Sequence, residues 1–492
     1  MIDYYHYMTF DRILKQGKSY YKVSVESYRK DGKVKQRYVK WVGKCDSEGN
    51  LISDNALERS EISDIYPCGW IAVVKKMAES INLAGILDSP YDGEILSLVY
   101  AHLKDYRSLE HMEQFLREND PEIFAKFSRA RYESAMDSLT GKNITEIQNR
   151  IYSSLEDQLG SGVIYYDLTH IYFYGSSPWV EDGYNAERRR EDQITLGLAV
   201  EKRYGLPLFH LPFKGNVSDK ETLDLIVSKL QSYNVRDCTL TFDRGITTRG
   251  NLKTIEEAGY TVTSGFSLRG KLKDRAVGYM KNTGMKNVVK LSDRYLYAKE
   301  MDERYMGARI VVCLNEESRV MIKKKRYEKL YGIISGKEKP SPKMMKFLKR
   351  VNGRYEINYE TVEMRERTDG IYAILTTTKS DPATVVREYY EKDLVEKAFQ
   401  SLKGVASIQP VRFWLYGRVP AHIFVCYLAY LLLTLMRKKL IDSGINKSPV
   451  QVMKELSPLY RVTITDSETG KSLRKFSPVS VKQRELFEIF GL

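Results

Sequence analysis

The amino-acid sequence predicts an α/β protein of several domains, built around a mixed sheet with helices on its faces. Four short apolar segments have the length and composition of buried strands: 163–168, 194–200, 207–213 and 239–242. Helical patterns follow the last two of these segments, and residues 71–158 have helical spacing throughout. A chain of 492 residues is too long for one ordinary core, so we expect roughly two to four domains.

The N-terminal part is predicted to hold a β-hairpin followed by helices. Residues 19–43 form two alternating segments around Asp31-Gly32, a pair that tolerates the positive φ angles of a tight turn. Basic residues crowd the turn and the second strand. We therefore predict a β-rich basic region over 1–70 and a helical region over 71–160.

The central α/β pattern is predicted to run over 161–270 and to resume over 371–440, as two parts of one core. Between them, residues 271–370 read as a basic, β-rich insertion. Residues 323–350 contain eleven Lys or Arg against Glu328 and Glu338, a net charge of +9. Such a stretch is not expected to pack as core. It suits either a surface that faces phosphates or a solvated, mobile loop.

A marked helix is predicted over residues 380–404, with Ser380 or Asp381 as its cap, Pro382 in its first turn and Gly404 at its end. An apolar helix follows over 418–438. The last segment, 441–492, reads as a small C-terminal appendage of helix, short strands and helix.

The charge of the chain points to a polyanionic partner. Lys and Arg exceed Asp and Glu by 78 to 64, which gives a net charge of +14 and a pI near 9.2. Nucleic acid is the first candidate, and general solubility is the alternative. On this view the helical region 71–160 is either DNA-binding or a spacer.

The cysteines and the apolar segments indicate a cytoplasmic protein that does not enter a membrane. The five cysteines are scattered and form no CxxC or metal-binding spacing, which fits thiols in a reducing compartment. The most apolar run, Ile423 to Met436, has 14 residues, whereas a bilayer requires about 20. We expect it to be a buried helix.

Three carboxylates have the setting of a metal site. Asp167 and Asp243 each close an apolar strand that gives way to a turn. Two divalent ions about 4 Å apart activate the nucleophile and stabilise the leaving oxygen when a phosphodiester is cut, and hard ions such as Mg²⁺ prefer carboxylate oxygens. An Asp at the end of a strand is more often a turn cap, so this pair alone is a weak signal.

The helix over 380–404 supplies the third acid. On an ideal helix Tyr389, Lys392, Glu396 and Lys403 share a stripe about 60° wide. The opposite face is apolar and is predicted to pack on the sheet. An ordinary amphipathic helix with ion pairs has the same pattern. The apolar face consists of Leu394, Val395, Ala398 and Leu402.

The spacing Tyr389-x2-Lys392-x3-Glu396-x6-Lys403 resembles the Y-x2-R-x3-E-x6-K signature of bacterial insertion-sequence DDE transposases. More narrowly, the chain resembles the group with a β-rich insertion between the second Asp and the Glu. Lys392 stands where Arg is usual, so the charge is kept but the bidentate fork is lost. Other segments that resemble this family are YYDLTHIYFYG, LTFDRGITTRGNL, RVPAHIFVCYLAYLL and SVKQRELFEIFGL.

The resemblance covers most of 160–492 and implies a ribonuclease-H-like core that cuts and joins DNA with two Mg²⁺ ions, or with Mn²⁺. It implies that Asp167, Asp243 and Glu396 are the catalytic residues and metal ligands. Tyr389, Lys392 and Lys403 would contact DNA phosphates. The implied partners are double-stranded DNA, at the terminal inverted repeats and at the target, and a second copy of the chain, because two ends must be held together. The bacterial nucleoid is then the expected location.

Two other functions fit the same carboxylates. A ribonuclease-H-like nuclease would cut without strand transfer. A decayed relative would bind DNA without chemistry, although such a copy has no reason to keep all three acids.

Overall fold

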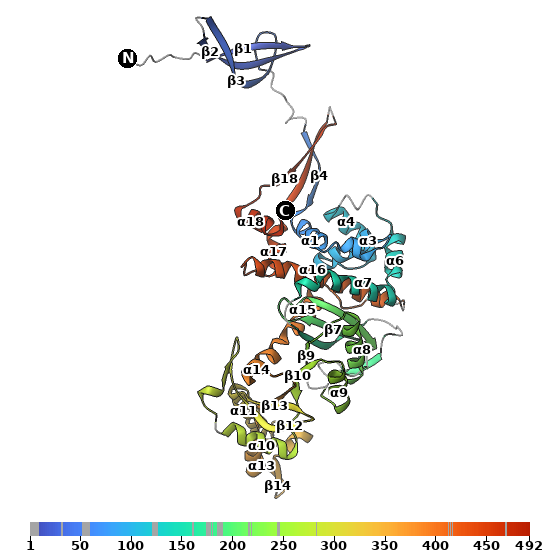
Figure 1. Cartoon of the computed structure of the whole chain (residues 1–492), viewed down its shortest axis with the longest axis vertical. Coiled ribbons are helices and arrows are strands. Elements are labelled where there is room, and N and C mark those ends of the chain that lie inside the picture. The colour runs from blue at the N-terminus through green and yellow to red at the C-terminus, as the bar shows by residue number, and fades with distance from the viewer. Residues whose placement is uncertain are drawn as a thin grey trace, which may run out of the picture. The chain divides into compact units, whose positions relative to one another are not determined.

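The computed structural model places strands and helices along most of the chain (Figure 1). It describes residues 9–30, 33–51, 60–120, 126–159, 162–173, 179, 181–184, 190–214, 217, 219–243, 247–281, 283–411, 413, 415, 417–467 and 470–492. The chain divides into two compact units. Unit 1 comprises Met1–Cys68 and Leu459–Val479, and unit 2 comprises Gly69–Pro458 and Ser480–Leu492.

Unit 1 begins with a three-stranded antiparallel sheet of β1 (Thr9–Gln16), β2 (Ser19–Lys30) and β3 (Lys33–Cys45). Lys30 pairs with Lys33, so the predicted hairpin is confirmed, and β1 adds a strand that was not predicted. The predicted turn residues Asp31 and Gly32 lie outside the described residues.

A second sheet of unit 1 corrects the predicted C-terminal appendage. Its strand order is β18 (Ser472–Phe476), β17 (Tyr460–Asp466) and β4 (Ser60–Pro67). Because the backbone of β17 pairs with that of β4, almost 400 residues earlier in the chain, residues 441–492 are not one appendage. The helices α17 (Pro449–Leu456) and α18 (Val481–Phe490) belong to unit 2.

The first part of unit 2 is helical, as the apolar spacing predicts. It contains α1 (Gly69–Ser80), α2 (Leu83–Leu87), α3 (Asp92–Lys104), α4 (Met112–Asn119), α6 (Arg129–Ser138) and α7 (Gly141–Leu155). The apolar helix α16 (Arg418–Asp442) packs against α1, α3, α6 and α7. This helix is longer than predicted and apolar enough to cross a membrane, but its most apolar window is completely buried inside the chain. The prediction of a buried helix is confirmed.

A ten-stranded mixed sheet forms the centre of unit 2, and the prediction of a mixed α/β core is confirmed. Along one part of it the strand order is β8, β7, β5, β9, β10, where β5, β9 and β10 are parallel and β7 is antiparallel to β5. Beyond β10 the order continues with β16, β13, β12 and β11, and β6 pairs with β7. The bounds are β5 Val163–Tyr172, β6 Glu181–Tyr184, β7 Arg190–Glu201, β8 Pro207–Lys214, β9 Thr239–Phe242, β10 Thr261–Phe266, β11 Val288–Lys290, β12 Tyr295–Tyr305, β13 Ala308–Leu314 and β16 Ile371–Thr376.

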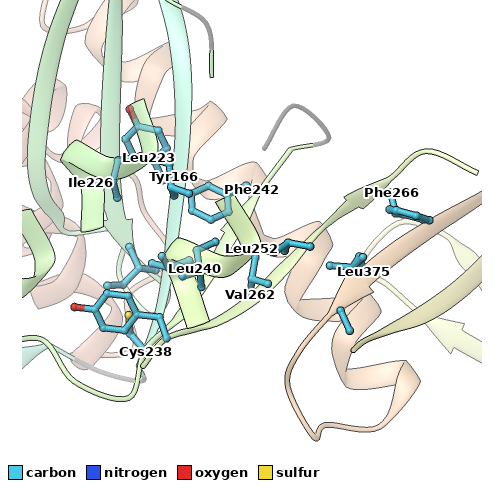
Figure 2. Packing of buried hydrophobic residues seen from close by; sticks show 14 of the residues in the cluster. Tyr166, Leu223, Ile226, Cys238, Leu240, Phe242, Leu252, Val262, Phe266 and Leu375 are labelled. Carbon is cyan, nitrogen blue, oxygen red and sulfur yellow. The ribbon is translucent and has the colours of Figure 1, made fainter. Parts of the chain in front are cut away.

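Helices cover both faces of this sheet. Side chains of α8 (Asp219–Ser232), α9 (Arg249–Glu257) and α10 (Gly270–Lys281) pack on one face in the main hydrophobic cluster. Figure 2 shows part of this cluster, in which the rings of Tyr166 and Phe242 lie 6.2 Å apart. Alternate residues of β13 belong to a second cluster with α14 (Pro382–Glu391), so α14 covers the opposite face.

The segment 271–370 is not the β-rich insertion that the sequence predicted, because helices make up much of it. After β11, β12 and β13 join the main sheet, α11 (Glu316–Ile334), α12 (Pro342–Met345) and α13 (Tyr359–Glu366) flank a small hairpin. The hairpin pairs β14 (Leu348–Val351) with β15 (Arg354–Ile357). These elements enclose a separate small core of Leu330, Ile333, Met344, Phe347, Ile357 and Val362.

The basic stretch 323–350 therefore does contribute to a core, contrary to the sequence prediction. Most of its lysines are exposed, whereas four of its apolar residues are buried: Leu330, Ile333, Met344 and Phe347. Arg326 is the exception among its cations, because it is buried and its Nη2 lies 2.7 Å and 2.6 Å from the two carboxylate oxygens of Asp369. A buried guanidinium held in this way does not face phosphates.

Candidate active site

Asp167 lies within β5, on the face of the sheet that α14 and α15 (Asp393–Gly404) cover. Successive strand residues point to opposite faces. Tyr166 belongs to the cluster beneath α8 and α9, so its neighbours Tyr165 and Asp167 point the other way. The hydroxyl of Tyr165 donates to Glu391 at the end of α14, which agrees with this assignment. The sequence predicted that the strand ends at Asp167. Instead, β5 continues to Tyr172, so Asp167 lies inside the strand.

Asp243 follows the last residue of β9 and is exposed. The hydroxyl of Tyr389 donates to its Oδ1 across 3.2 Å. The hydroxyl of Ser264, on the neighbouring parallel strand β10, donates to its main-chain oxygen across 2.8 Å. One contact orients the carboxylate and the other holds the backbone at the end of the strand.

The predicted single helix over 380–404 is two helices, α14 and α15, that meet at Lys392. Asp381 caps the first helix by accepting from the main-chain N–H groups of Ala383 and Thr384, as predicted. The break leaves the predicted apolar face intact, because Val395, Ala398 and Leu402 are buried and α15 packs on β5 and β7; Leu394 is only partly buried.

Glu396 stands in the first turn of α15 with 51% of its side chain exposed. The ammonium of Lys392 lies 3.4 Å from its Oε1 and is itself mostly buried. Tyr389 is only 8% exposed, and its hydroxyl points to Asp243. The residues that share one face of an ideal helix therefore differ in burial: Tyr389 is buried, whereas Glu396 is open to solvent.

An ion-pair network that the sequence did not suggest fastens α14 to the sheet. Lys202, just beyond β7, lies 3.3 Å from Glu388 and 3.0 Å from Glu391. Tyr165 donates to the same Glu391 across 3.1 Å. The two glutamates are one helical turn apart in sequence, but nothing local pairs them with a lysine of a distant strand. The network fixes the start of α15 relative to β5, and so fixes Glu396 relative to Asp167.

The charges of the site act on one another. Burial raises the pKa of Asp167 to about 6, and the carboxylates of Asp243 and Glu396 add to the rise. Lys392 and the N–H of Leu168 oppose it. Burial alone would lower the pKa of Lys392, but Asp243, Glu396 and Asp167 together raise it. All three predicted acids and Lys392 thus lie close enough to interact electrostatically.

Lys403 lies two turns beyond Glu396 on α15, roughly 10 Å farther along the helix axis. It is half-buried, and burial lowers its pKa. Within the described part of the chain no ion pair neutralises it. A partly desolvated cation without a partner suits a phosphate.

The donor set fits hard divalent cations. Three carboxylates offer six oxygens, and one of the carboxylates is partly buried with like charges nearby. Within the described residues, the oxygens of the three carboxylates are not all within 4.8 Å of one another. A cavity of about 580 Å³ adjoins Tyr389 and Lys392 and is lined by cationic and aromatic groups, including Arg294, Arg365 and Tyr390.

Comparisons with known proteins identify the family of the chain. The transposase DDE domain family matches residues 158–432, and the N-terminal domain family of IS1634 transposases matches residues 13–62. No curated protein matches the chain. A solved piggyBac transposase, in a synaptic complex with hairpin DNA, is 11% identical with a TM-score of 0.39, over 78% of this chain and 77% of that one. The DDE match covers more than half of the chain and contains Asp167, Asp243 and Glu396; the chain therefore belongs to the insertion-sequence DDE transposases, enzymes that cut and join DNA.

Proposed function

We propose that this DNA transposase moves its element by a cut-and-paste route, with Asp167, Asp243 and Glu396 holding two Mg²⁺ ions, or Mn²⁺, in a ribonuclease-H-like core. The observation that carries the proposal is the convergence of the three acids and Lys392 on the face covered by α14 and α15. The order β8, β7, β5, β9, β10, in which only β7 runs antiparallel to the other four strands, supports the ribonuclease-H-like assignment.

The three carboxylates are held by different elements and differ in their exposure to solvent. Asp167 is held by the rigid middle of a strand, and Asp243 by two hydrogen bonds at a strand end. Glu396 is on a helix and is open to solvent. When bound, the ions would lower the pKa of the attacking water or hydroxyl and stabilise charge on the leaving oxygen. The exposed Glu396 leaves room for DNA at the same face.

The same site serves two in-line displacements. First, water attacks a phosphodiester at the end of the element: the new P–O bond forms, the 3′ oxygen leaves, and the water proton passes to solvent. Then the freed 3′-hydroxyl attacks target DNA, forming one P–O bond and breaking another. Both steps require only that the phosphate be held in line with its nucleophile.

The structure suggests different roles for the three neighbouring side chains. Tyr389 is a positioning residue, because its buried hydroxyl orients Asp243 and is not presented to DNA. Lys392 offsets the charge of the acids and can turn toward a phosphate. Lys403 binds phosphate farther along the strand, which would neutralise its half-buried charge.

Double-stranded DNA at the inverted repeats and at the target would also meet the basic segment 323–350. Nine of its cations are exposed on α11, α12, β14 and the loops between them: Lys324, Lys325, Lys329, Lys337, Lys339, Lys343, Lys346, Lys349 and Arg350. We propose that they bind the DNA backbone near the cut, and that a homodimer holds the two ends together in the bacterial nucleoid.

The decisive experiment is cleavage of DNA carrying the element's own ends, in Mg²⁺, by wild type and Glu396→Gln. The variant keeps the size of the side chain and loses its charge. We expect end cleavage to fall by roughly 1000-fold, because several kcal/mol of transition-state stabilisation is lost. DNA affinity, measured by fluorescence anisotropy without metal, should stay within a few-fold of wild type.

Asp393→Asn is the matched control, since Asp393 is an exposed acid in the same turn of α15. It should cut as wild type does. Equal loss in both variants would mean that general charge in this turn, and not a ligand, matters. Cleavage by Glu396→Gln at the wild-type rate would remove Glu396 from the site, and cuts without joined products in wild type would favour a nuclease.

A further inference from the structure

A second group of potential metal ligands lies in the helical part of unit 2. His102 is in the last turn of α3, while His422 and Cys426 are one turn apart on α16. Their donor atoms all lie within 4.8 Å of one another, and within the described residues this is the one such group of three. All three are buried, with 2%, 2% and 0% of their surfaces exposed.

The distances inside the group match those between ligands of a small cation. The sulfur of Cys426 lies 3.6 Å from Nδ1 of His102 and 3.9 Å from Nε2 of His422. With Zn–S near 2.3 Å and Zn–N near 2.0–2.1 Å, the ligand atoms of a tetrahedral site are about 3.5 Å apart. The main-chain oxygens of Ala406 and Ile408 lie 2.7 Å and 3.1 Å from the same two ring nitrogens.

The surroundings favour a soft or borderline ion and exclude water. Tyr106 stacks on His102 with ring centroids 3.9 Å apart, and Phe413 lies 5.4 Å from His422. One thiolate and two imidazoles select Zn²⁺ or Co²⁺ over Mg²⁺, which requires oxygen ligands. No aspartate or glutamate belongs to this group of described ligands.

We propose that His102, His422 and Cys426 form a closed structural site for one Zn²⁺ ion, with a main-chain oxygen of the segment 405–411 as the fourth ligand. On binding, the Cys426 thiol loses its proton to solvent and its sulfur forms the bond to zinc. Each imidazole stays neutral and keeps its one proton on the ring nitrogen that faces away from the metal. For His102 the proton moves from Nδ1, which faces the Ala406 oxygen, to Nε2; for His422 it moves from Nε2, which faces the Ile408 oxygen, to Nδ1.

The site joins three pieces of chain that are remote in sequence. It ties α3 of the helical region to α16, and both to the segment that follows α15. That segment continues from the helix that carries Glu396 and Lys403. The zinc would therefore fix the far end of α15, while the Lys202 network fixes its start.

The test is the metal content of the untagged full-length protein, measured by plasma mass spectrometry after dialysis without chelator. We expect one zinc per chain in wild type and none above background in Cys426→Ser. Replacement by Co²⁺ adds a spectroscopic readout, since a thiolate ligand gives a ligand-to-metal charge-transfer band that carboxylate sites cannot give. The band should appear in wild type and be absent in Cys426→Ser.

Cys313→Ser is the control, because Cys313 is equally buried and free but lies in the sheet. It should keep both the zinc and the band. Cys426→Ala guards against misfolding, since it keeps the site apolar; its circular dichroism should match that of wild type. A wild type that takes up neither ion, or a Cys426→Ser protein that keeps the band, overturns the proposal. These readouts use no DNA, so they are independent of the transposase mechanism.

Discussion

The carboxylate site and the His102–His422–Cys426 cluster are built on opposite physical terms. The first places three acidic side chains, partly open to solvent, close enough to act on one another electrostatically. The second gathers neutral donors that are buried, where they approach one another without the repulsion of like charges. The difference teaches that a catalytic site costs folding free energy, whereas a buried neutral site can add to it.

The substitution with the largest expected effect, Asp167→Asn, tests whether the carboxylate site lowers the stability of the fold. Cleavage should fall by roughly 1000-fold, because a ligand is lost. Stability should rise by about 1 kcal/mol in EDTA, because a buried carboxylate with two acidic neighbours becomes a neutral amide. Urea unfolding of both proteins measures this. A variant less stable than wild type would show that Asp167 is structural.

The second expected effect is a loss of folding stability at acidic pH, caused by His422 in the buried His102–His422–Cys426 cluster. Burial lowers the pKa of His422 to about 4, whereas an unfolded histidine titrates near 6.5. Below pH 6.5 the unfolded chain binds a proton that the folded chain does not, so stability falls as the pH falls toward 4. His422 should contribute up to about 3 kcal/mol to this loss.

The measurement is the stability of wild type and His422→Gln between pH 7 and pH 4, in EDTA. The glutamine can still donate to the Ile408 oxygen but does not titrate, so the two curves should converge as the pH falls. Parallel curves would mean that the pKa of His422 is the same in the folded and the unfolded protein.

The smallest effect separates positioning from DNA contact at Tyr389. Tyr389→Phe removes the hydroxyl that donates to Asp243 and leaves the buried ring. We expect a roughly fivefold fall in the cleavage rate at saturating DNA, since one hydrogen bond contributes about 1 kcal/mol. DNA affinity should be unchanged. A fall in affinity with an unchanged saturated rate would instead place the hydroxyl on a phosphate.

The sequence predicted most of the core of unit 2, because strand alternation and helical spacing are local. The site residues came from the family resemblance, and their roles stay a prediction. It did not predict the break at Lys392, since an ideal projection contains no tertiary contacts. The pairing of β17 with β4 and the approach of His102 to His422 join residues more than 300 positions apart, and no local pattern encodes them.

The insertion was mispredicted for a different reason. High charge between 323 and 350 hid the helical spacing of Leu330 and Ile333, which face a small core. Arg326 looked like its neighbours but is neutralised by Asp369, far along the chain. Charge alone does not tell a buried cation from an exposed one.

The central claim, that these acids are metal ligands, is tested most directly by changing one ligand and the metal together. Asp243 is exposed at the end of a strand, so Asp243→Cys should fold normally. We predict that this variant loses end cleavage in Mg²⁺, which binds thiolate poorly, and recovers part of it in Mn²⁺, which is softer. Cleavage by the variant at the wild-type rate in Mg²⁺ would contradict the assignment.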